Sequence, residues 1–340
     1  MNKTKEILLI SFLQAFGIVL VVVGHAFNGH EEIALHRWIY SFHMPLFMFI
    51  SGYLFKYGNE LNHKTLRDIS RQERRVFLRK KAIRLLVPYI VISSLTVFPK
   101  YLLNAYAIHP VEFSFGTYLH MLAYPFDNVI IPFWFLPTLF LIFAFAIYGA
   151  AILGRIKQNI KYLPEIILSL LLMLHVFNPA KNIELFNIGG IVHYLFYFGL
   201  GYYGCMKHLE TKTSSNALPL FIVTFGISLL LLCVPNFKGS DAICAINGIL
   251  MSICLGQLYE KRRWHFLHHL FGASYAIYLF SWFPQVLSQQ VLLGVTDLPW
   301  QIGSGLAIIT GLYGPLLLYK VIKKGKQTRT GRIIAFLTGQ

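Results

Sequence analysis

Long apolar runs constrain the fold of this chain more than any other feature of its sequence. A helix needs about 20 mostly apolar residues to cross the hydrocarbon core of a bilayer. The runs are apolar on nearly every face and lack a two-residue alternation, which favours helices over a β-barrel. We therefore predict an all-α, polytopic integral membrane protein with about ten transmembrane helices, and a single membrane domain over residues 1–340. The ten candidate spans are 7–27, 38–56, 83–103, 130–153, 163–177, 187–205, 217–235, 241–258, 268–293 and 299–320.

Composition narrows the class of protein further. Hydrophobic residues make up 56% of the chain and charged residues 13%, whereas soluble domains average about 25% charged residues. This excludes an ordinary soluble enzyme, a disordered chain and a disulfide-dense secreted domain. The net charge of +16 would suit a nucleic-acid-binding protein, but the density of aromatic and aliphatic residues would not, so we expect no nucleic-acid partner. The four cysteines form no CxxC pair and predict no metal site.

The lysines and arginines divide unevenly between the segments that join the spans. With the N-terminus in the cytoplasm, 26 of the 30 lie on the cytoplasmic side, whereas the acidic residues divide evenly. This bias follows the positive-inside rule and predicts that both termini are cytoplasmic. A basic loop at about 57–82 and a tail at about 321–340 then lie on the same side. The first span lacks a following small-residue cleavage site, so we expect it to be retained rather than removed as a signal peptide.

Two histidines within the apolar spans are candidate functional residues, because ionisable groups are costly in a bilayer. His25 lies near the outer end of the first span, and His43 near the outer start of the second. Gln14 precedes His25 by eleven residues, so the two side chains share one helix face about 16 Å apart along the axis. From composition alone, His25 is equally well explained as a histidine that only hydrogen-bonds a neighbour.

Four sequence blocks carry a resemblance to a known family. They read QAFGIVLVVVGH at 14–25, YSFHMPLFMFISGYLF at 40–55, FLRKKAIRLLVPY at 77–89 and PFWFLP at 132–137. In order and spacing they resemble the acyltransferase-3 family of bacterial membrane O-acyltransferases, especially its fucose 4-O-acetylase-like branch. The resemblance covers essentially the whole chain and implies about ten spans with both ends cytoplasmic.

The resemblance also implies an activity. The protein is expected to transfer an acyl group, usually acetyl, from cytoplasmic acyl-CoA to a hydroxyl of a cell-envelope polysaccharide or its lipid-linked precursor. Acetyl-CoA would be a co-substrate, with no permanently bound cofactor, and the protein would be a multi-pass protein of the bacterial inner membrane. Its oligomeric state is not predicted.

The family's first-span histidine corresponds to His25, which is thereby implied to be catalytic. A histidine titrates near pH 6.5 and can accept the proton of a sugar hydroxyl that attacks a thioester carbonyl. A covalent acyl-histidine is the alternative. His43 would then orient groups, relay protons or contact substrate.

Two further residues would support these histidines. Gln14 stands where the family usually has Arg or Lys, which replaces a fixed charge by an amide able to donate two hydrogen bonds. Ser51 is a second supporting candidate, although small residues at 51 and 52 also permit close packing of helices. A later position, Ser281, stands where relatives often have a histidine.

A cluster of cations precedes the third span and is a candidate binding site for the phosphates of CoA. Arginine forks and lysine charges both suit phosphate groups. Topology alone also places such clusters beside anionic lipid. Arg84 is the preferred member because it lies within the RLLVPY block. The cluster consists of Arg79, Lys80, Lys81 and Arg84.

A membrane carrier that exports a lipid-linked glycan or a metabolite, without acyl transfer, is the alternative function. Carriers of this kind are expected to bury paired charges in several spans and to contain two related halves. Acidic residues are nearly absent from the spans of this chain, and no such repeat is visible in it. The carrier is therefore the second hypothesis.

Overall fold

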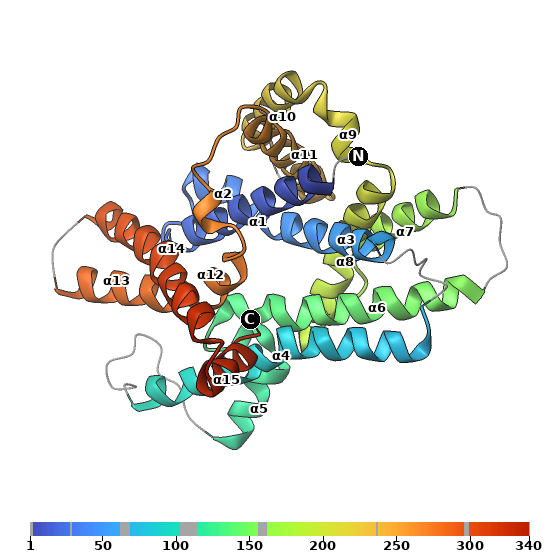
Figure 1. Cartoon of the computed structure of the whole chain (residues 1–340). Coiled ribbons are helices and arrows are strands. Elements are labelled where there is room, and N and C mark those ends of the chain that lie inside the picture. The colour runs from blue at the N-terminus through green and yellow to red at the C-terminus, as the bar shows by residue number, and fades with distance from the viewer. Residues whose placement is uncertain are drawn as a thin grey trace. The chain divides into compact units, whose positions relative to one another are not determined.

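The computed structural model describes residues 3–27, 29–61, 69–102, 114–155, 162–235, 237–295 and 299–339. All regular secondary structure in these residues is helical, and they contain no strand (Figure 1). The all-α prediction is therefore confirmed for this part of the chain. The chain divides into two compact units, one of residues 1–57 and 197–321 and the other of residues 58–196 and 322–340.

The first unit holds the N-terminal helices and most of the C-terminal half of the chain. Its helix α1 packs against α11, where the rings of Phe12 and Tyr259 lie 4.7 Å apart. Its apolar core joins Ile18 and Val22 of α1 to Ile277 of α12. The helices of this unit are α1 (Lys3–His25), α2 (Ala34–Tyr40), most of α3 (His43–Leu61), the second half of α8 (Ile188–Met206), α9 (Leu209–Ser214), α10 (Ala217–Leu231), α11 (Ser240–Lys261), η5 (His268–Leu270), α12 (Ser274–Phe280), α13 (Trp282–Val295) and most of α14 (Trp300–Gly325).

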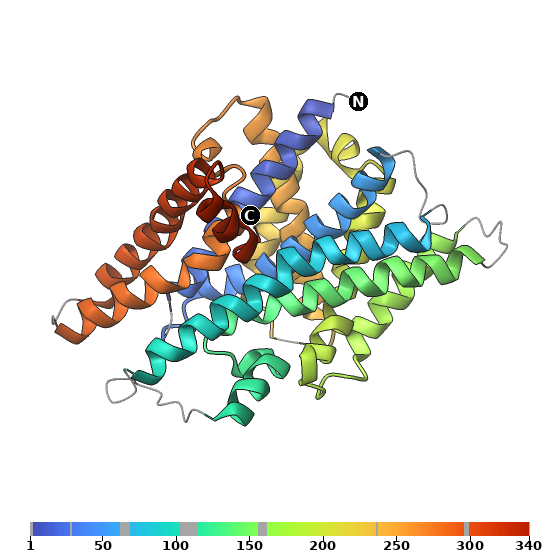
Figure 2. The same cartoon turned by 60° about the horizontal axis from the view of Figure 1, so that its bottom comes forward.

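The second unit is built on two long helices, α4 and α6, which lie side by side in both views (Figures 1 and 2). Buried polar contacts fasten α4 to the turns before α6, since the Ser93 hydroxyl and the Asn128 side chain hydrogen-bond at 3.0–3.1 Å. The helices of this unit are α4 (Arg71–Leu102), α5 (Phe115–Ala123), η2 (Pro125–Asp127), η3 (Ile131–Trp134), α6 (Phe135–Arg155), α7 (Leu163–Phe177), η4 (Leu185–Asn187), the first half of α8 and α15 (Arg329–Leu337).

The apolar helices match the predicted spans in part. Among the described residues, four helices are long and apolar enough to cross a bilayer, and α7 and α10 are shorter apolar helices. The chain is therefore a helical membrane protein. The count of ten spans, the cytoplasmic termini and the single domain stay predictions. The four long segments are Leu8–His25, Ile131–Ile152, Ser240–Lys261 and Trp300–Gly325.

Two predicted spans, 38–56 and 268–293, are wrong as continuous helices. The first divides into α2 and α3 and the second into η5, α12 and α13. Pro45 lies in the first turn of α3, and Pro284 in the first turn of α13. Because proline has no amide hydrogen to donate to the carbonyl four residues earlier, each preceding helix ends and a new one begins.

The basic segment predicted as a loop at about 57–82 is helical at both ends. Helix α3 continues to Leu61, and α4 begins at Arg71, well before the apolar run. A capping box explains that early start, because the Ser70 hydroxyl accepts from the Glu73 amide and the Glu73 carboxylate accepts from the Ser70 amide. The cations that precede the third span are therefore carried on the same helix as the span itself.

Candidate functional site

His25 is the last residue of α1 and is half-buried. Its Nδ1 atom lies 3.1 Å from the hydroxyl oxygen of Tyr40, the last residue of α2. The two rings meet edge to face, at 87° and with centroids 6.1 Å apart. Tyr40 is 42% exposed, so this contact is not enclosed by the protein.

Two further histidines surround Tyr40. The His36 ring stacks on the Tyr40 ring with centroids 3.9 Å apart, and the His43 ring lies 4.7 Å from it on the α3 side. Both histidines are buried. His43 Nδ1 lies 2.9 Å from the carbonyl oxygen of Ile39. A carbonyl only accepts, so His43 Nδ1 carries a hydrogen, and Nε2 of the neutral ring keeps its lone pair.

The contact between His25 and Tyr40 has a chemical consequence. If His25 Nδ1 carries the hydrogen, it donates to the Tyr40 oxygen, and the lone pair on Nε2 is available to accept a proton. If Tyr40 donates instead, Nε2 carries the hydrogen and can give it up. The arrangement can therefore hold and move a proton at His25.

The end of α1 that carries His25 is held by side chains from α13 and α14. The last carbonyls of a helix lack partners within it. The Ala26 carbonyl accepts from the Gln289 amide at 3.0 Å and from the Ser304 hydroxyl at 2.7 Å. The Val22 carbonyl accepts from the buried Gln285 amide at 2.8 Å. These bonds fix the position of His25 on the unit that contains all of these residues.

The loop between α1 and α2 adds charge beside the histidines. The Glu31 carboxylate accepts from the Gly29 amide at 3.0 Å, and this bond holds the pKa of that exposed carboxyl below its usual range. The His30 ring stacks on Trp300 at 4.2 Å. An ionised carboxylate therefore lies on the loop that leads from His25 to His36.

The structure does not bring Gln14 or Ser51 to His25. Gln14 is half-buried in α1, eleven residues and thus about 16 Å before His25. Ser51 is half-buried in α3, eight residues after His43. Its neighbour Gly52 lies directly against the Phe198 backbone of α8, so the small residues here do permit a close crossing of helices. Functional roles for Gln14 and Ser51 stay predictions.

The four predicted phosphate ligands differ in their surroundings on α4. Arg79 and Lys80 are exposed. Lys81 is half-buried, with its ammonium 4.0 Å from the centre of the Phe143 ring. Arg84 is exposed and lines a cavity together with residues of the C-terminal segment. Within the described residues, only Arg84 of the four lines this cavity.

Neither Tyr40 nor His36 was predicted from the sequence as a functional residue, although their spacing is informative. His36, Tyr40 and His43 follow one another at intervals of four and three residues, which is the spacing of one helix face. Gln285 and Gln289 were also missed. These two glutamines are also four residues apart. Their local sequence does not indicate that they donate to carbonyls at the end of the first helix.

The fold and this site define a helical membrane protein with a histidine cluster at the end of its first apolar helix. Residues 8–320 match the acyltransferase-3 family model, which is described as an acyltransferase domain. The chain belongs to the acyltransferase-3 family and is an acyltransferase. No curated protein and no solved structure matches it significantly.

Proposed function

We propose that this acyltransferase transfers an acetyl group from cytoplasmic acetyl-CoA to a hydroxyl of a cell-envelope carbohydrate or its lipid-linked precursor. It would act in the bacterial inner membrane, with ten spans and cytoplasmic termini, as in the fucose 4-O-acetylase-like branch of the family. The observation that carries the proposal is the contact between His25 and Tyr40, in a chain whose family transfers acyl groups.

The proposed step needs one group that takes a proton and later returns it. His25 Nε2 accepts the proton of the acceptor hydroxyl while that oxygen bonds to the thioester carbonyl carbon. The carbon–sulfur bond then breaks, and the thiolate of CoA takes the proton from the imidazolium. The products are the acetyl ester and free CoA, with the imidazole restored. Atoms and charges balance without a metal or a redox partner.

Tyr40 and His43 have supporting roles in this scheme. A hydrogen bond from His25 Nδ1 to the Tyr40 oxygen keeps the lone pair on Nε2, and it stabilises the imidazolium that forms during the step. The rings of His36 and His43 both contact the tyrosine ring and would help to hold it in place. His43 is buried and keeps a lone pair on Nε2, with which it would orient neighbouring groups.

Replacing His25 tests the proposal. His25→Ala should reduce transfer of acetyl groups to the acceptor at least a hundredfold, because general-base catalysis typically contributes 10²–10⁴-fold. The measurements are release of CoA by purified protein and the mass of the cell-envelope glycan. His269→Ala is the matched control. His269 is exposed and lies in η5, which follows α11 in the chain, and its ring stacks on Tyr313 rather than on Tyr40. Unchanged acetylation at normal protein levels would remove His25 from the mechanism.

A different measurement distinguishes the covalent route through an acyl-histidine from direct transfer. An acyl-histidine would accumulate when acetyl-CoA is supplied without acceptor, and one equivalent of CoA would be released in a burst. Direct transfer predicts neither the burst nor an acetylated peptide containing His25. Movement of a glycan across the membrane without consumption of acetyl-CoA would support the carrier instead.

A further inference from the structure

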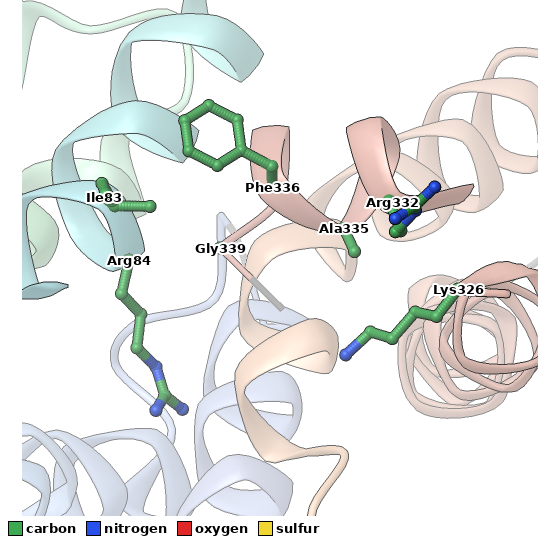
Figure 3. Close-up of a pocket in the computed structure, with 7 residues that line it drawn as sticks. All are labelled: Ile83, Arg84, Lys326, Arg332, Ala335, Phe336 and Gly339. Atoms are coloured by element: carbon green, nitrogen blue, oxygen red, sulfur yellow. The ribbon is translucent and has the colours of Figure 1, made fainter. Parts of the chain in front are cut away.

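A cavity of about 450 Å³ lies in the second unit, at the start of the third predicted span. One wall is α4, and the other is the C-terminal segment that comprises α15 and the turn before it (Figure 3). Most of its lining lies beyond residue 320, where the match to the family ends. The lining residues are Ile83, Arg84, Lys326, Arg332, Ala335, Phe336 and Gly339.

Close backbone contacts hold α15 in place. The Thr328 hydroxyl caps the helix by accepting from the Gly331 amide at 3.0 Å. Gly331 lies directly on the backbone of Gly325, where a Cβ has no room. At the other end, Gly339 has a φ of +64°, and a Cβ there would lie 2.5 Å from the Arg84 carbonyl oxygen. The C-terminal segment therefore packs against α4 at Arg84, the preferred phosphate ligand among the predicted cations.

The lining combines positive charge with an apolar wall. Arg84, Lys326 and Arg332 are all exposed, so a ligand can reach them, and none of the seven lining residues is acidic. Figure 3 shows the ammonium end of Lys326 directed towards the space between it and Arg84. Phe336, 51% exposed, contributes an aromatic face beside these charges. Arginine and lysine together suit phosphate groups, and an exposed aromatic ring suits a purine.

We propose that this cavity holds the 3′-phosphoadenosine end of the acyl-CoA donor, with Lys326 and Arg332 as phosphate ligands alongside Arg84. The inference rests on the proposed function, which supplies the donor, and it makes the C-terminal helix part of the donor site. A volume of about 450 Å³ falls within the range of small-ligand pockets. All three cations lie in segments that the charge distribution places in the cytoplasm, where acyl-CoA is found.

The test compares two ligands that differ by one phosphate. Binding of CoA and of dephospho-CoA is measured for the full chain in nanodiscs of phosphatidylcholine. The wild-type protein should bind CoA about tenfold more tightly than dephospho-CoA. The K326Q/R332Q variant should bind CoA about tenfold more weakly and lose most of the preference for the 3′-phosphate. In steady-state assays this variant should raise KM for acetyl-CoA about tenfold and leave kcat unchanged, because the contact is made in the ground state and the transition state alike.

Two further variants separate the site from general effects of charge and folding. Arg329→Gln removes a cation that lies on α15 but does not line the cavity. The affinity for CoA should stay within twofold of the wild-type value. Gly339→Val changes no charge but collides with the Arg84 backbone, so it should weaken CoA binding as the double variant does. The comparison of the two ligands on the wild-type protein needs no variant to fold.

Each result decides between definite alternatives. Equal affinity of the wild-type protein for the two ligands, or wild-type CoA binding by K326Q/R332Q, would overturn the inference and leave the proposed function intact. Failure of the wild-type protein to bind or consume acetyl-CoA would instead defeat the proposed function. Unchanged CoA binding by K326Q/R332Q, with weaker retention of phosphatidylglycerol, would assign the cavity to a lipid headgroup and also overturn the inference.

Discussion

At the residue scale, the two nitrogens of His25 have different surroundings. Nδ1 faces the Tyr40 hydroxyl at 3.1 Å, so its hydrogen-bond partner belongs to the protein. Within the part of the chain that the structure describes, Nε2 has no hydrogen-bond partner from the protein, and the ring is only half-buried. A histidine with one nitrogen engaged in this way has a defined ring orientation, which a histidine without a partner in an apolar helix lacks. The pairing therefore gives the His25 hypothesis a physical basis that its position in the sequence did not.

Removing only the Tyr40 hydroxyl tests this pairing. Tyr40→Phe keeps the ring that stacks on His36 and removes the oxygen that contacts His25. We expect kcat to fall about tenfold with little change in KM for acetyl-CoA, because a hydrogen bond to a charged group is worth about 1.5–3 kcal/mol and part of it is replaced by water. The measurement is the rate of CoA release at saturating substrates.

The control for Tyr40→Phe is Tyr313→Phe, because Tyr313 is a similarly exposed tyrosine, 45% against 42%, whose ring stacks on a histidine away from this site. It should retain the wild-type rate. A Tyr40→Phe enzyme with the wild-type kcat would show that the hydroxyl neither orients His25 nor stabilises its charged form.

At the scale of elements, close helix contacts at glycines stabilise the first unit. In the first unit, α3 crosses the second half of α8 so closely that Gly52 lies on the Phe198 carbonyl and Gly201 on the Phe49 carbonyl. Small residues allow such approaches in membranes, where packing rather than the hydrophobic effect drives the association of helices. The crossing positions α3, which begins at His43.

A pair of substitutions within α3 measures this crossing. Gly52→Ala should lower the stability of the protein by about 1–3 kcal/mol, because the added methyl group meets backbone that can yield only by separating the helices. Gly58→Ala is the matched control, since a Cβ there meets nothing within 4 Å. Alanine is the better helix former, so the control should be neutral or more stable by up to about 1 kcal/mol.

Thermal unfolding of the two glycine variants in detergent, followed by loss of the monodisperse peak, gives the comparison. Equal midpoints for Gly52→Ala and the wild-type protein would mean that α3 and α8 are not in close contact at Gly52.

At the scale of the whole molecule, some features could be predicted from the sequence because they depend on local composition. The apolar run at 163–177 begins and ends with α7, since polar residues and prolines bound it on both sides. The helix breaks at Pro45 and Pro284 were missed because apolar composition continues across them. A hydropathy pattern records where a segment lies in a bilayer, not where its hydrogen-bond ladder is interrupted.

The prediction of functional residues from the sequence is limited in the same way. His25 stood out because a titratable group in an apolar run is rare. Tyr40 did not, because a tyrosine near the end of a span is ordinary at a membrane interface. The cavity at Arg84 could not be predicted from the sequence. Arg332 lies some 250 residues away along the chain, and only the fold brings the two residues to one cavity.

The orientation of the chain is the prediction on which both proposals depend at this scale. With 26 of the 30 lysines and arginines on one side, the loop that contains Glu32 should face the periplasm and the segment that contains Gln327 the cytoplasm. Single cysteines at these positions, in a chain whose native cysteines are replaced by alanine or serine, can be labelled with a membrane-impermeant maleimide on intact spheroplasts. Glu32→Cys should label at once, and Gln327→Cys only after permeabilisation, because both positions are exposed and differ only in side.

The reverse pattern would place the cavity at Arg84 outside the cell, away from the supply of acyl-CoA, and would contradict the donor site even if CoA bound to it in vitro. Labelling of both positions in intact spheroplasts would imply an even number of crossings between them. It would thereby contradict the ten-span arrangement, in which the loop at Glu32 is separated from the C-terminal tail by nine spans. The expected result leaves His25 near the periplasmic end of the first span and Arg84 near the cytoplasmic end of the third. The thioester end of acetyl-CoA must then extend from the cytoplasmic side into the membrane before it meets the acceptor.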